Sequence, residues 1–291
     1  MGEDDPARNP LASGEFPTLR LTRTQKPVSG SGPPALAYGL DASLGVRGLP
    51  QSATGQTTIL TGVNAAAAMG KHLSGFPGPS LRSTLEQHSI LKRVREAGLS
   101  ASFLNAFGPR FFEMAETQRR LSATSLATLA SGAPFRTWAD LLEGRAVVHD
   151  LTHWRVREWG YDLPLRSAEE AGAIIAQEAA KQDFSLFEYF ETDRAGHDQD
   201  LERARRCLSD LDRALNVALM RLDPSSTTVI VASDHGNVED ASVKTHTLNP
   251  AFFALWGAWT PSRLPTALTD LVPLIWEALG RPAAGGTTAV A

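Results

Sequence analysis

The sequence contains one cysteine, Cys207, and so no pair that could form a disulfide within the chain. Cys207 lies in a charged stretch with helical character, RARRCLSDLDRAL. No apolar run approaches the roughly 20 residues that a membrane-spanning helix needs. The first residues, MGEDDPARNP, are acidic and interrupted by proline, unlike a secretory signal peptide. These absences predict a cytoplasmic protein that does not bind a membrane.

An excess of basic charge is also missing. The chain has 28 lysine and arginine residues against 32 acidic residues, a formal net charge of −4 at pH 7. Nucleic-acid-binding surfaces are usually basic, so no nucleic-acid partner is expected. The 291 residues, of which 42% are hydrophobic, are enough for a sizeable core. We expect a single α/β domain over residues 1–291.

Strand-like and helix-like stretches alternate along the chain after a start, residues 1–35, that is rich in proline, glycine and serine. Apolar runs predict strands at 36–41, 99–107, 183–193, 227–233 and 251–257, with a further possible strand at 146–149. Helical patterns are found at 56–70, 81–98, 167–182, 200–222 and 268–279, with shorter pieces near 111–121 and 139–142. This alternation is typical of an α/β fold with a mostly parallel sheet.

Acidic and imidazole side chains follow two of the predicted strands. Asp193 and His197 lie at and just beyond the carboxyl end of the strand at 183–193, and Asp234 and His235 come directly after the strand at 227–233. Ligands of α/β sheets bind beyond the carboxyl ends of the strands, so these groups are expected at one edge of the sheet. The glycine between Asp193 and His197 predicts a tight turn that aims both side chains inward.

Carboxylates and imidazoles together suit zinc, manganese or related divalent ions better than calcium or magnesium, which prefer oxygen ligands. Just past a strand end, Asp234 and His235 could each bind one of two neighbouring metals, and His246 could complete one set. Taken singly, each residue has a simpler explanation, since Asp-His-Gly also suits a turn and His246 also suits a surface loop. The four other histidines have no comparable setting: His72, His88, His149 and His153.

Ser52 is the candidate nucleophile. It lies in PQSATGQT, just before an apolar helix, where backbone N–H groups and the positive end of the helix dipole favour a phosphate group. A nearby divalent metal would favour its alkoxide form. The alternative is that Ser52 only caps the helix, as serine and threonine often do. Thr54 and Thr57 are weaker candidates for the nucleophile.

Four motifs occur in order: GLPQSATGQTTILTGVNA, TDRAGHDQD, SDHGNVED and THTLNP. Together they resemble the alkaline phosphatase superfamily, and within it the metalloenzyme-domain branch related to cofactor-independent phosphoglycerate mutase and phosphopentomutase. The resemblance extends from about residue 41 to residue 257. It implies an alkaline-phosphatase-like three-layer sandwich, two divalent metal ions (manganese or zinc) and a phosphorylated serine or threonine intermediate.

The resemblance also implies how the ligands divide between the two metals. Asp193, His197 and His246 match the ligands of one metal, and Asp234 and His235 match ligands of the other, together with Ser52. The family pattern begins with an apolar strand ending in Asp-Gly, whose aspartate also binds the second metal. No such strand precedes residue 36, so an N-terminal strand is expected to be missing and Met1 to be a truncated or misassigned start. Asp4 and Asp5 are poor substitutes, because neither follows a strand.

The related mutases carry a large cap domain over the site, whereas residues 108–165 leave room only for a small inserted lid. Side chains that such a lid could offer to a substrate are Arg110, Arg136, Arg145, Asp150, His153 and Arg155, although most of them are expected to be solvated charges. A small lid excludes water less well, which favours hydrolysis over intramolecular transfer.

The expected function is therefore metal-dependent phosphoryl transfer on a small phosphorylated substrate, of the phosphatase or phosphomutase type. The alternative is a catalytically impaired member that acts as a binding or scaffold protein, because the N-terminal ligand is absent. The motifs are specific for the superfamily and not for one substrate.

Overall fold

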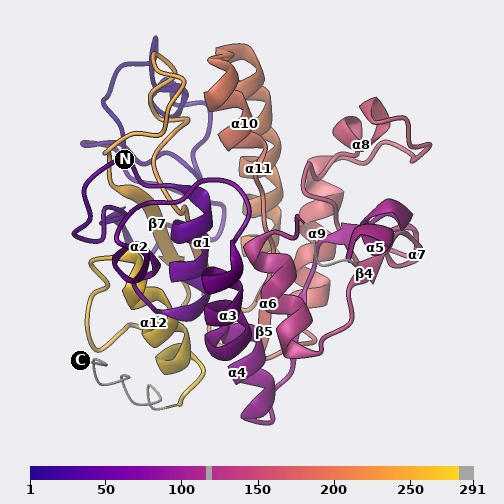
Figure 1. The fold of residues 1–291 in the computed structure, drawn as a ribbon. Helices are drawn as coiled ribbons and strands as arrows, with labels where there is room; N and C mark the ends of the chain where they lie inside the picture. The colour runs from indigo at the N-terminus through magenta and orange to yellow at the C-terminus, as the bar shows by residue number, and fades with distance from the viewer. Residues whose placement is uncertain (116–119, 282–291) are drawn as a thin grey trace.

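A computed structural model describes residues 1–115 and 120–281 of the chain (Figure 1). Helices and strands alternate as expected, and the α/β class is confirmed. The strands are β1 (Leu36–Leu40), β2 (Ala101–Phe103), β3 (Ala106–Phe107), β4 (Arg136–Thr137), β5 (Phe184–Leu186), β6 (Val229–Ala232) and β7 (Ala251–Trp256). The larger helices are α1 (Ser52–Thr61), α3 (Pro79–His88), α6 (Ala123–Ser131), α9 (Ala168–Ala179), α10 (Glu191–Asp198), α11 (Leu201–Arg221) and α12 (Leu271–Ala278).

Shorter helical segments complete the described part of the fold. They are η1 (Pro10–Ser13), α2 (Ala65–Met69), α4 (Ile90–Glu96), α5 (Pro109–Ala115), α7 (Trp138–Leu142), α8 (Trp154–Glu158) and η2 (Leu268–Asp270). None of the helices in residues 1–115 and 120–281 is long and apolar enough to cross a membrane. The cytoplasmic location stays a prediction.

The largest sheet has the strand order β1-β7-β6 and lies between two layers of helices. On one face, Phe253 and Leu255 of β7 pack with Leu271 and Leu274 of α12. On the other face, Trp256 packs with Leu219 of α11. Alternate residues of one strand thus enter different cores, because successive side chains of a strand point to opposite faces. The result is the three-layer arrangement that the resemblance implies.

The pairing of the strands differs from the single, mostly parallel sheet that the sequence predicts. β7 runs antiparallel to both β1 and β6, whereas β2 and β5 form a separate parallel pair and β3 and β4 a third small sheet. The expectation about strand ends still holds, because both β5 and β6 lead into segments that meet at one edge of the molecule. Their carboxyl ends therefore carry the candidate site.

Two predicted helices are each broken in two. The prediction of one helix over 81–98 is wrong at Ser89, whose ψ of 138° ends α3 and whose side chain caps α4 by accepting a bond from the N–H of Lys92. The prediction over 56–70 is wrong in both its start and its continuity, since α1 begins at Ser52 and ends before Gly62, a glycine at φ 75°. In both cases local capping overrides the apolar period.

The strand predicted at 183–193 ends much earlier. β5 stops at Leu186, and α10 begins at Glu191, so Asp193 and His197 lie on a helix instead of a tight turn. Residues four apart on a helix share one face, so this helix aligns the two side chains more firmly than a turn would. The strand predicted at 99–107 is likewise divided into β2 and β3.

The described parts of the segment 108–165, residues 108–115 and 120–165, contain short helices and a small core of their own. Figure 1 shows α5, α7 and α8 together at one side of the molecule. Val148, Val156 and Leu163 belong to this small core, whereas Leu126 of α6 belongs to the main one. The helix predicted at 111–121 corresponds to α5 in part, and residues 116–119 of that prediction lie outside the described residues. At 146–149 the described structure has a single bridge, between Asn105 and Val147, and no strand. The lid itself stays a prediction.

Candidate metal centre

The six residues proposed as ligands or nucleophile come from four segments that meet at one place. Ser52 begins α1, Asp193 and His197 lie on α10, Asp234 and His235 follow β6, and His246 lies in the loop before β7. The atoms His235 Nε2 and Asp193 Oδ1 are 3.9 Å apart, and the rings of His235 and His246 stack with centroids 3.6 Å apart. The fold therefore gathers residues that are up to about two hundred positions apart in the chain.

Asp193, His197 and His246 form the tightest part of this cluster. His246 Nε2 lies 3.1 Å from His197 Nε2 and 3.4 Å from Asp193 Oδ1, and His197 Nε2 lies 3.5 Å from Asp193 Oδ2. Two ligands of a tetrahedral zinc ion lie about 3.3 Å apart, given metal–ligand bonds of about 2.0–2.1 Å. The spacing of these three atoms therefore fits a shared divalent cation.

The tautomers of the two histidines also fit a cation. His197 Nδ1 lies 2.7 Å from the carbonyl oxygen of Lys244, and His246 Nδ1 lies 2.7 Å from that of Pro50. A carbonyl oxygen can only accept, so each Nδ1 carries the proton and each neutral ring turns an Nε2 lone pair toward the other. Two lone pairs and a carboxylate that face one another at these distances require positive charge between them.

A proton can partly supply that charge in the absence of a cation. Burial lowers the pKa of His246, but hydrogen bonds to Asp193 and to the Pro50 carbonyl outweigh it and raise the pKa overall. Burial raises the pKa of Asp193, but His246 and the other neighbouring imidazoles lower it overall. Protons and metal ions are therefore expected to compete for the same atoms.

Ser52 is not the cap of its helix. The N-cap position of α1 is Gln51, and the Ser52 hydroxyl lies 3.0 Å from His235 Nε2 instead. Thr54 and Thr57 are fully buried and donate their hydroxyl hydrogens to the backbone carbonyls of Gln51 and Ala53. Of the three hydroxyls, only that of Ser52 faces the cluster, which favours it as the nucleophile.

Asp234 and His235 are adjacent to the first cluster but do not complete a second trio. Asp234 Oδ2 lies 3.4 Å from His235 Nε2 and is buried without a hydrogen-bond partner. Within the described ranges 1–115 and 120–281, the trio of Asp193, His197 and His246 is the one set of three acidic, histidine or cysteine residues with ligand atoms within 4.8 Å of one another. A second metal at Asp234 and His235 stays a prediction.

The acidic residues at the start of the chain are used elsewhere. Asp4 accepts hydrogen bonds from the hydroxyls of Thr22 and Thr24, and Asp5 accepts one from the N–H of Ala7. Neither residue completes the set at Asp234 and His235, as the sequence led us to expect.

Glu239 stabilises the loop that carries Asp234 and His235, and it was not singled out from the sequence. Its buried carboxylate accepts hydrogen bonds from the N–H of Asn237, the hydroxyl of Thr247 and the amide of Asn249. It thereby ties the loop after β6 to the loop that carries His246. Its position inside the motif SDHGNVED was the available signal.

Gly196 sets how closely α10 approaches this loop. A Cβ atom at Gly196 would lie 1.4 Å from Asn237 Oδ1, so the helix and the loop fit only because position 196 has no side chain. Helix propensity alone predicts that alanine here stabilises the protein by up to about 1 kcal/mol.

We expect Gly196→Ala to lower the free energy of unfolding by about 1–3 kcal/mol instead, because either the buried side chain of Asn237 or α10 itself must shift to relieve the clash. Urea denaturation measures the change, and weakened metal binding should accompany it. The control is Gly78→Ala, at a negative φ with no atom within 4 Å of the added Cβ. A stabilised Gly196→Ala protein would contradict the close approach.

Glu188, also missed from the sequence, is a half-buried residue whose carboxyl group lies beside Thr124 and near Asp234. It accepts a hydrogen bond of 2.6 Å from the hydroxyl of Thr124. Burial raises its pKa to about 7, the Thr124 hydroxyl opposes this rise, and the negative charge of Asp234 adds to it. With this pKa the carboxyl group is mostly protonated below pH 7 in the folded state.

The raised pKa predicts a pH dependence of stability. The folded state binds the proton of Glu188 more tightly than the unfolded state does. The contribution of Glu188 to the free energy of unfolding is therefore full below a pH of about 4.5 and is lost as the pH rises through about 7. In metal-free wild-type protein, Glu188 should lower the free energy of unfolding by about 2–3 kcal/mol between pH 5 and pH 8, and Glu188→Gln should abolish this decrease. Urea denaturation at the two pH values measures it. Glu86→Gln, at an exposed position, is the control. If Glu188→Gln raised the free energy of unfolding equally at pH 5 and pH 8, Glu188 would not be the source of the pH dependence.

The charged residues of the segment 108–165 are occupied in structural interactions. Arg136 pairs with Glu178, Arg145 with Asp140, and Arg155 with Glu158. The remaining candidates behave alike: Arg110 lies over the Tyr161 ring, Asp150 accepts from the N–H groups of His153 and Arg155, and His153 bonds the Pro164 carbonyl. Their proposed role in substrate contact stays a prediction.

Glu191 joins this segment to α10 and was not expected from the sequence. Its carboxylate is fully buried and lies within 3.2 Å of Arg155 and 3.1 Å of Arg203. Burial alone would raise the pKa of Glu191, but His149, Arg155 and Arg203 lower it to about 2. This ion-pair network fixes the start of the helix that presents Asp193.

Fold and site together define an α/β protein with a carboxylate and imidazole cluster suited to a divalent metal. Residues 160–280 of the chain match the family model described as the Metalloenzyme superfamily. That segment includes the five candidate metal ligands and excludes Ser52.

Curated relatives named 2,3-bisphosphoglycerate-independent phosphoglycerate mutase align with part of the chain. The protein from Dinoroseobacter shibae is 35% identical over 132 residues, which are 42% of this chain and 26% of the relative. That from Desulforudis audaxviator is 32% identical over 131 residues, with the same two shares. The aligned part of the chain thus spans about a quarter of the length of these relatives. A solved structure of Leishmania mexicana phosphoglycerate mutase, determined at low cobalt concentration, is 16% identical, with a TM-score of 0.45 over 69% of this chain and 38% of that one.

Proposed function

We propose that the protein is a metal-dependent phosphoryl-transfer enzyme, of the phosphatase or phosphomutase type, that acts on a small phosphorylated substrate. The observation that carries the proposal is the Ser52 hydroxyl, 3.0 Å from His235 Nε2 and beside a trio of ligand atoms spaced for a divalent cation. The match of residues 160–280 to the Metalloenzyme superfamily and the partial alignment with phosphoglycerate mutases support the same class of reaction.

Two sets of residues would hold two divalent ions, manganese or zinc. The first set is Asp193, His197 and His246, and the second is Asp234 and His235 with the oxygen of Ser52. When bound, such ions supply positive charge that lowers the pKa of a coordinated hydroxyl and neutralises the phosphoryl oxygens. The backbone carbonyls of Lys244 and Pro50 hold the two imidazoles of the first set in the tautomer that binding requires.

Ser52 would act as the nucleophile. Its oxygen attacks phosphorus in line, the bond from Ser52 Oγ to phosphorus forms, and the bond from phosphorus to the leaving oxygen breaks. The hydroxyl proton of Ser52 passes to water and the leaving oxygen takes a proton from water, so that no net proton is gained or lost. The position of Ser52 in the first turn of α1 places the phosphoryl group at the positive end of the helix dipole.

The phosphoserine is then discharged by a second attack. Water yields inorganic phosphate, whereas a hydroxyl of the substrate yields an isomer of the substrate. In both cases the bond from Ser52 Oγ to phosphorus breaks and Ser52 regains a proton. The small lid proposed for residues 108–165 would exclude water only partly, which favours hydrolysis.

A second candidate function is a binding or scaffold protein with impaired catalysis. It is favoured by the incomplete second set, which has only Asp234 and His235 besides Ser52 among the described residues. Elemental analysis distinguishes the two functions. Two metal ions per chain support the enzyme, and none after incubation with manganese or zinc supports the scaffold.

A substrate panel tests the proposed reaction. The panel holds phosphomonoesters, phosphodiesters, sugar phosphates and, because they present a related tetrahedral group, sulfate esters. We expect turnover of a phosphomonoester or sugar phosphate that depends on manganese or zinc and stops with a chelator. Inactivity on the whole panel in protein that contains two metals per chain would contradict the proposal.

A further inference from the structure

Helix α10, which carries Asp193 and His197, is short and has no side-chain cap at its start. It spans eight residues, and its N-cap residue, Phe190, makes no capping hydrogen bond through its side chain. Isolated helices shorter than about 12 residues are barely stable in water, so the placement of α10 depends on contacts with the rest of the protein. Asp193 lies in the first turn, and its position therefore depends on what holds the start of the helix.

The carboxylate of Asp193 has less support than the two imidazoles of the trio. His197 Nδ1 and His246 Nδ1 each bond a backbone carbonyl outside the cluster. Asp193 Oδ1 is buried and has no hydrogen-bond partner in the described part of the chain, and the carboxylate pairs only with imidazoles of the same cluster. Hydrogen bonds from outside normally orient a metal ligand. Asp193 lacks them and depends on the backbone of α10 for its orientation.

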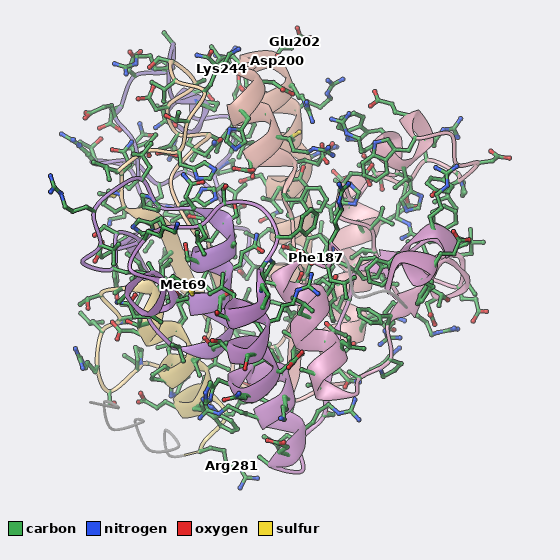
Figure 2. All side chains as sticks on the ribbon, viewed as in Figure 1. Met69, Phe187, Asp200, Glu202, Lys244 and Arg281 are labelled. Atoms are coloured by element: carbon green, nitrogen blue, oxygen red, sulfur yellow. The ribbon has the colours of Figure 1, made fainter. Side chains whose placement is uncertain are left out.

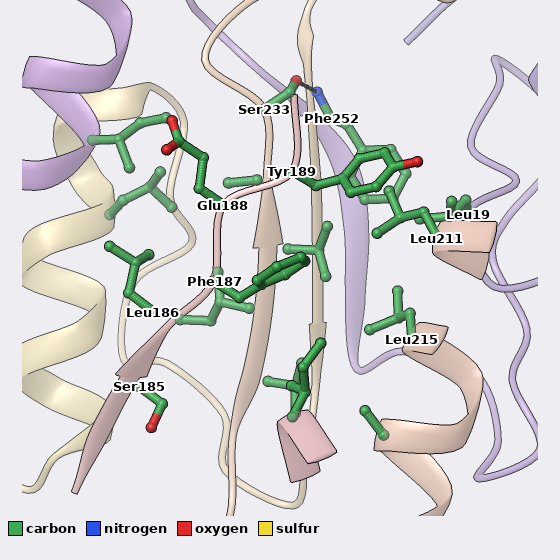
Figure 3. Close-up of a pocket in the computed structure, with 18 of the residues that line it drawn as sticks. Leu19, Ser185, Leu186, Phe187, Glu188, Tyr189, Leu211, Leu215, Ser233 and Phe252 are labelled. Carbon is green, nitrogen blue, oxygen red and sulfur yellow. Dashed lines mark hydrogen bonds between the residues drawn. The ribbon is translucent and has the colours of Figure 1, made fainter. Parts of the chain in front are cut away.

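The two ends of α10 are held by different elements. At its carboxyl end the carbonyl of Lys244 bonds His197, and Figure 2 shows Lys244 and Asp200, which lies just past α10, at the same end of the molecule. At the other end, Tyr189 precedes the N-cap and turns toward α11 (Figure 3), where its hydroxyl donates to the carbonyl of Cys207. The N-cap residue and the first turn have a separate set of contacts.

His149, in the segment 149–159, contacts the start of α10 in two ways. Its ring lies between two aromatic rings, with its centroid 4.3 Å from that of Phe190 and 5.2 Å from that of Trp159. Its Nε2 atom lies 3.4 Å from Glu191 Oε1, and both atoms are buried without a hydrogen bond to any other group among the described residues. His149 thus contacts both the N-cap residue and the first residue of the helix.

Of these two contacts, the ring contact has no substitute. The carboxylate of Glu191 also has three arginine partners within 3.7 Å, namely Arg155, Arg194 and Arg203. The loss of the imidazole nitrogen would therefore leave Glu191 neutralised. The ring of Phe190, in contrast, stacks on His149 alone within residues 1–115 and 120–281. Stacked aromatic pairs have preferred geometries, so this contact restricts where Phe190 can lie.

We propose that His149 is a positioning residue for the metal centre: its ring holds Phe190, and thereby the first turn of α10, so that Asp193 faces the two imidazoles of the trio. The inference rests on the proposed function, because it concerns the same metal centre. Energetic coupling between two sites is reciprocal. A metal ion that fixes Asp193 therefore also stabilises the stack and the segment 149–159, which belongs to the proposed lid.

Metal titration of three variants tests the role of the ring. His149→Ala removes it and should weaken the affinity of metal-free protein for zinc or manganese by about tenfold, as is typical when a group that orients a ligand is lost. His149→Phe keeps a ring between Phe190 and Trp159 and should restore most of the affinity. The control is Tyr161→Ala, which removes a ring packed on Trp138 in the small core of the lid segment and should bind metal as the wild type does. Equal affinity losses in His149→Ala and His149→Phe, or in His149→Ala and the control, would overturn the proposal.

Hydrogen exchange tests the positioning without metal. In metal-free protein, His149→Ala should speed exchange in peptides covering 190–198 by about tenfold, whereas His149→Phe and Tyr161→Ala should leave it unchanged. Phe190→Leu removes the other ring of the pair and should act as His149→Ala does, which keeps the test decisive if His149→Ala fails to fold. Exchange in 190–198 at the wild-type rate in both ring-deleting variants would overturn the proposal.

The same measurement separates this inference from the proposed function. In the wild type, saturating zinc or manganese should slow exchange in peptides covering 149–159, and His149→Ala should abolish that effect. Unchanged exchange there in metal-loaded protein would overturn the coupling to the lid segment. A wild type that binds no metal would contradict the proposed function, and exchange in metal-free protein would still decide whether His149 positions α10.

Discussion

Replacing Ser52 with alanine is expected to lower kcat for the preferred phosphorylated substrate by about 10⁴-fold or more, the scale of losing a nucleophile. The variant should still bind metal through the first set, because Asp193, His197 and His246 bind it without the serine. It should also fold, since Ser52 makes no capping bond to its own helix. The measurements are turnover, metal content and the melting temperature.

Two further proteins sharpen this result. Ser80→Ala makes the same change at an exposed position in the first turn of another helix, α3, and should leave turnover unchanged. Under single-turnover conditions the wild type should gain the mass of one phosphoryl group on the peptide that holds Ser52, and Ser52→Ala should gain none. Full turnover in Ser52→Ala, or a phosphoryl group on another residue, would remove Ser52 from the mechanism.

The meeting of the candidate residues could be predicted from the sequence. The reasoning needed only that an apolar strand precedes each acid and imidazole pair and that strand ends share an edge. Asp193 and His197 were expected on a turn and lie on α10. They still point the same way, because a four-residue spacing aligns side chains on one face of a helix.

What could not be predicted depends on long-range packing. Ser89 breaks a helix whose apolar period is continuous, because its side chain and ψ serve a cap that the period does not reveal. Glu188 looks in the sequence like one polar residue in a strand. Its pKa is raised by burial and by the negative charge of Asp234, and both depend on segments that are distant in the sequence. The division of the sheet has no local signal. The apolar run Val229–Ala232 suggests a strand with neighbours on both edges, but among the described residues it pairs with β7 alone.

Removal of His246 is expected to weaken metal binding strongly. Its Nε2 atom lies within 3.4 Å of both Asp193 and His197, so His246→Ala leaves two ligands, one of them on an exposed side chain. The affinity of metal-free protein for zinc or manganese, measured by calorimetric titration, should fall by about 100-fold or more. His88→Ala, in α3 and outside the cluster, is the matched control and should bind as the wild type does.

The same variant separates a metal ligand from a merely structural histidine. His246 Nδ1 also bonds the Pro50 carbonyl, so His246→Ala can loosen the segment before Ser52 without any effect through a metal. Asp193→Asn avoids this ambiguity, because it keeps the size of the side chain and both imidazoles and removes only the charge. If the trio binds the metal, both variants lose affinity to a similar degree; unchanged affinity in Asp193→Asn would mean that the three side chains meet for a structural reason alone.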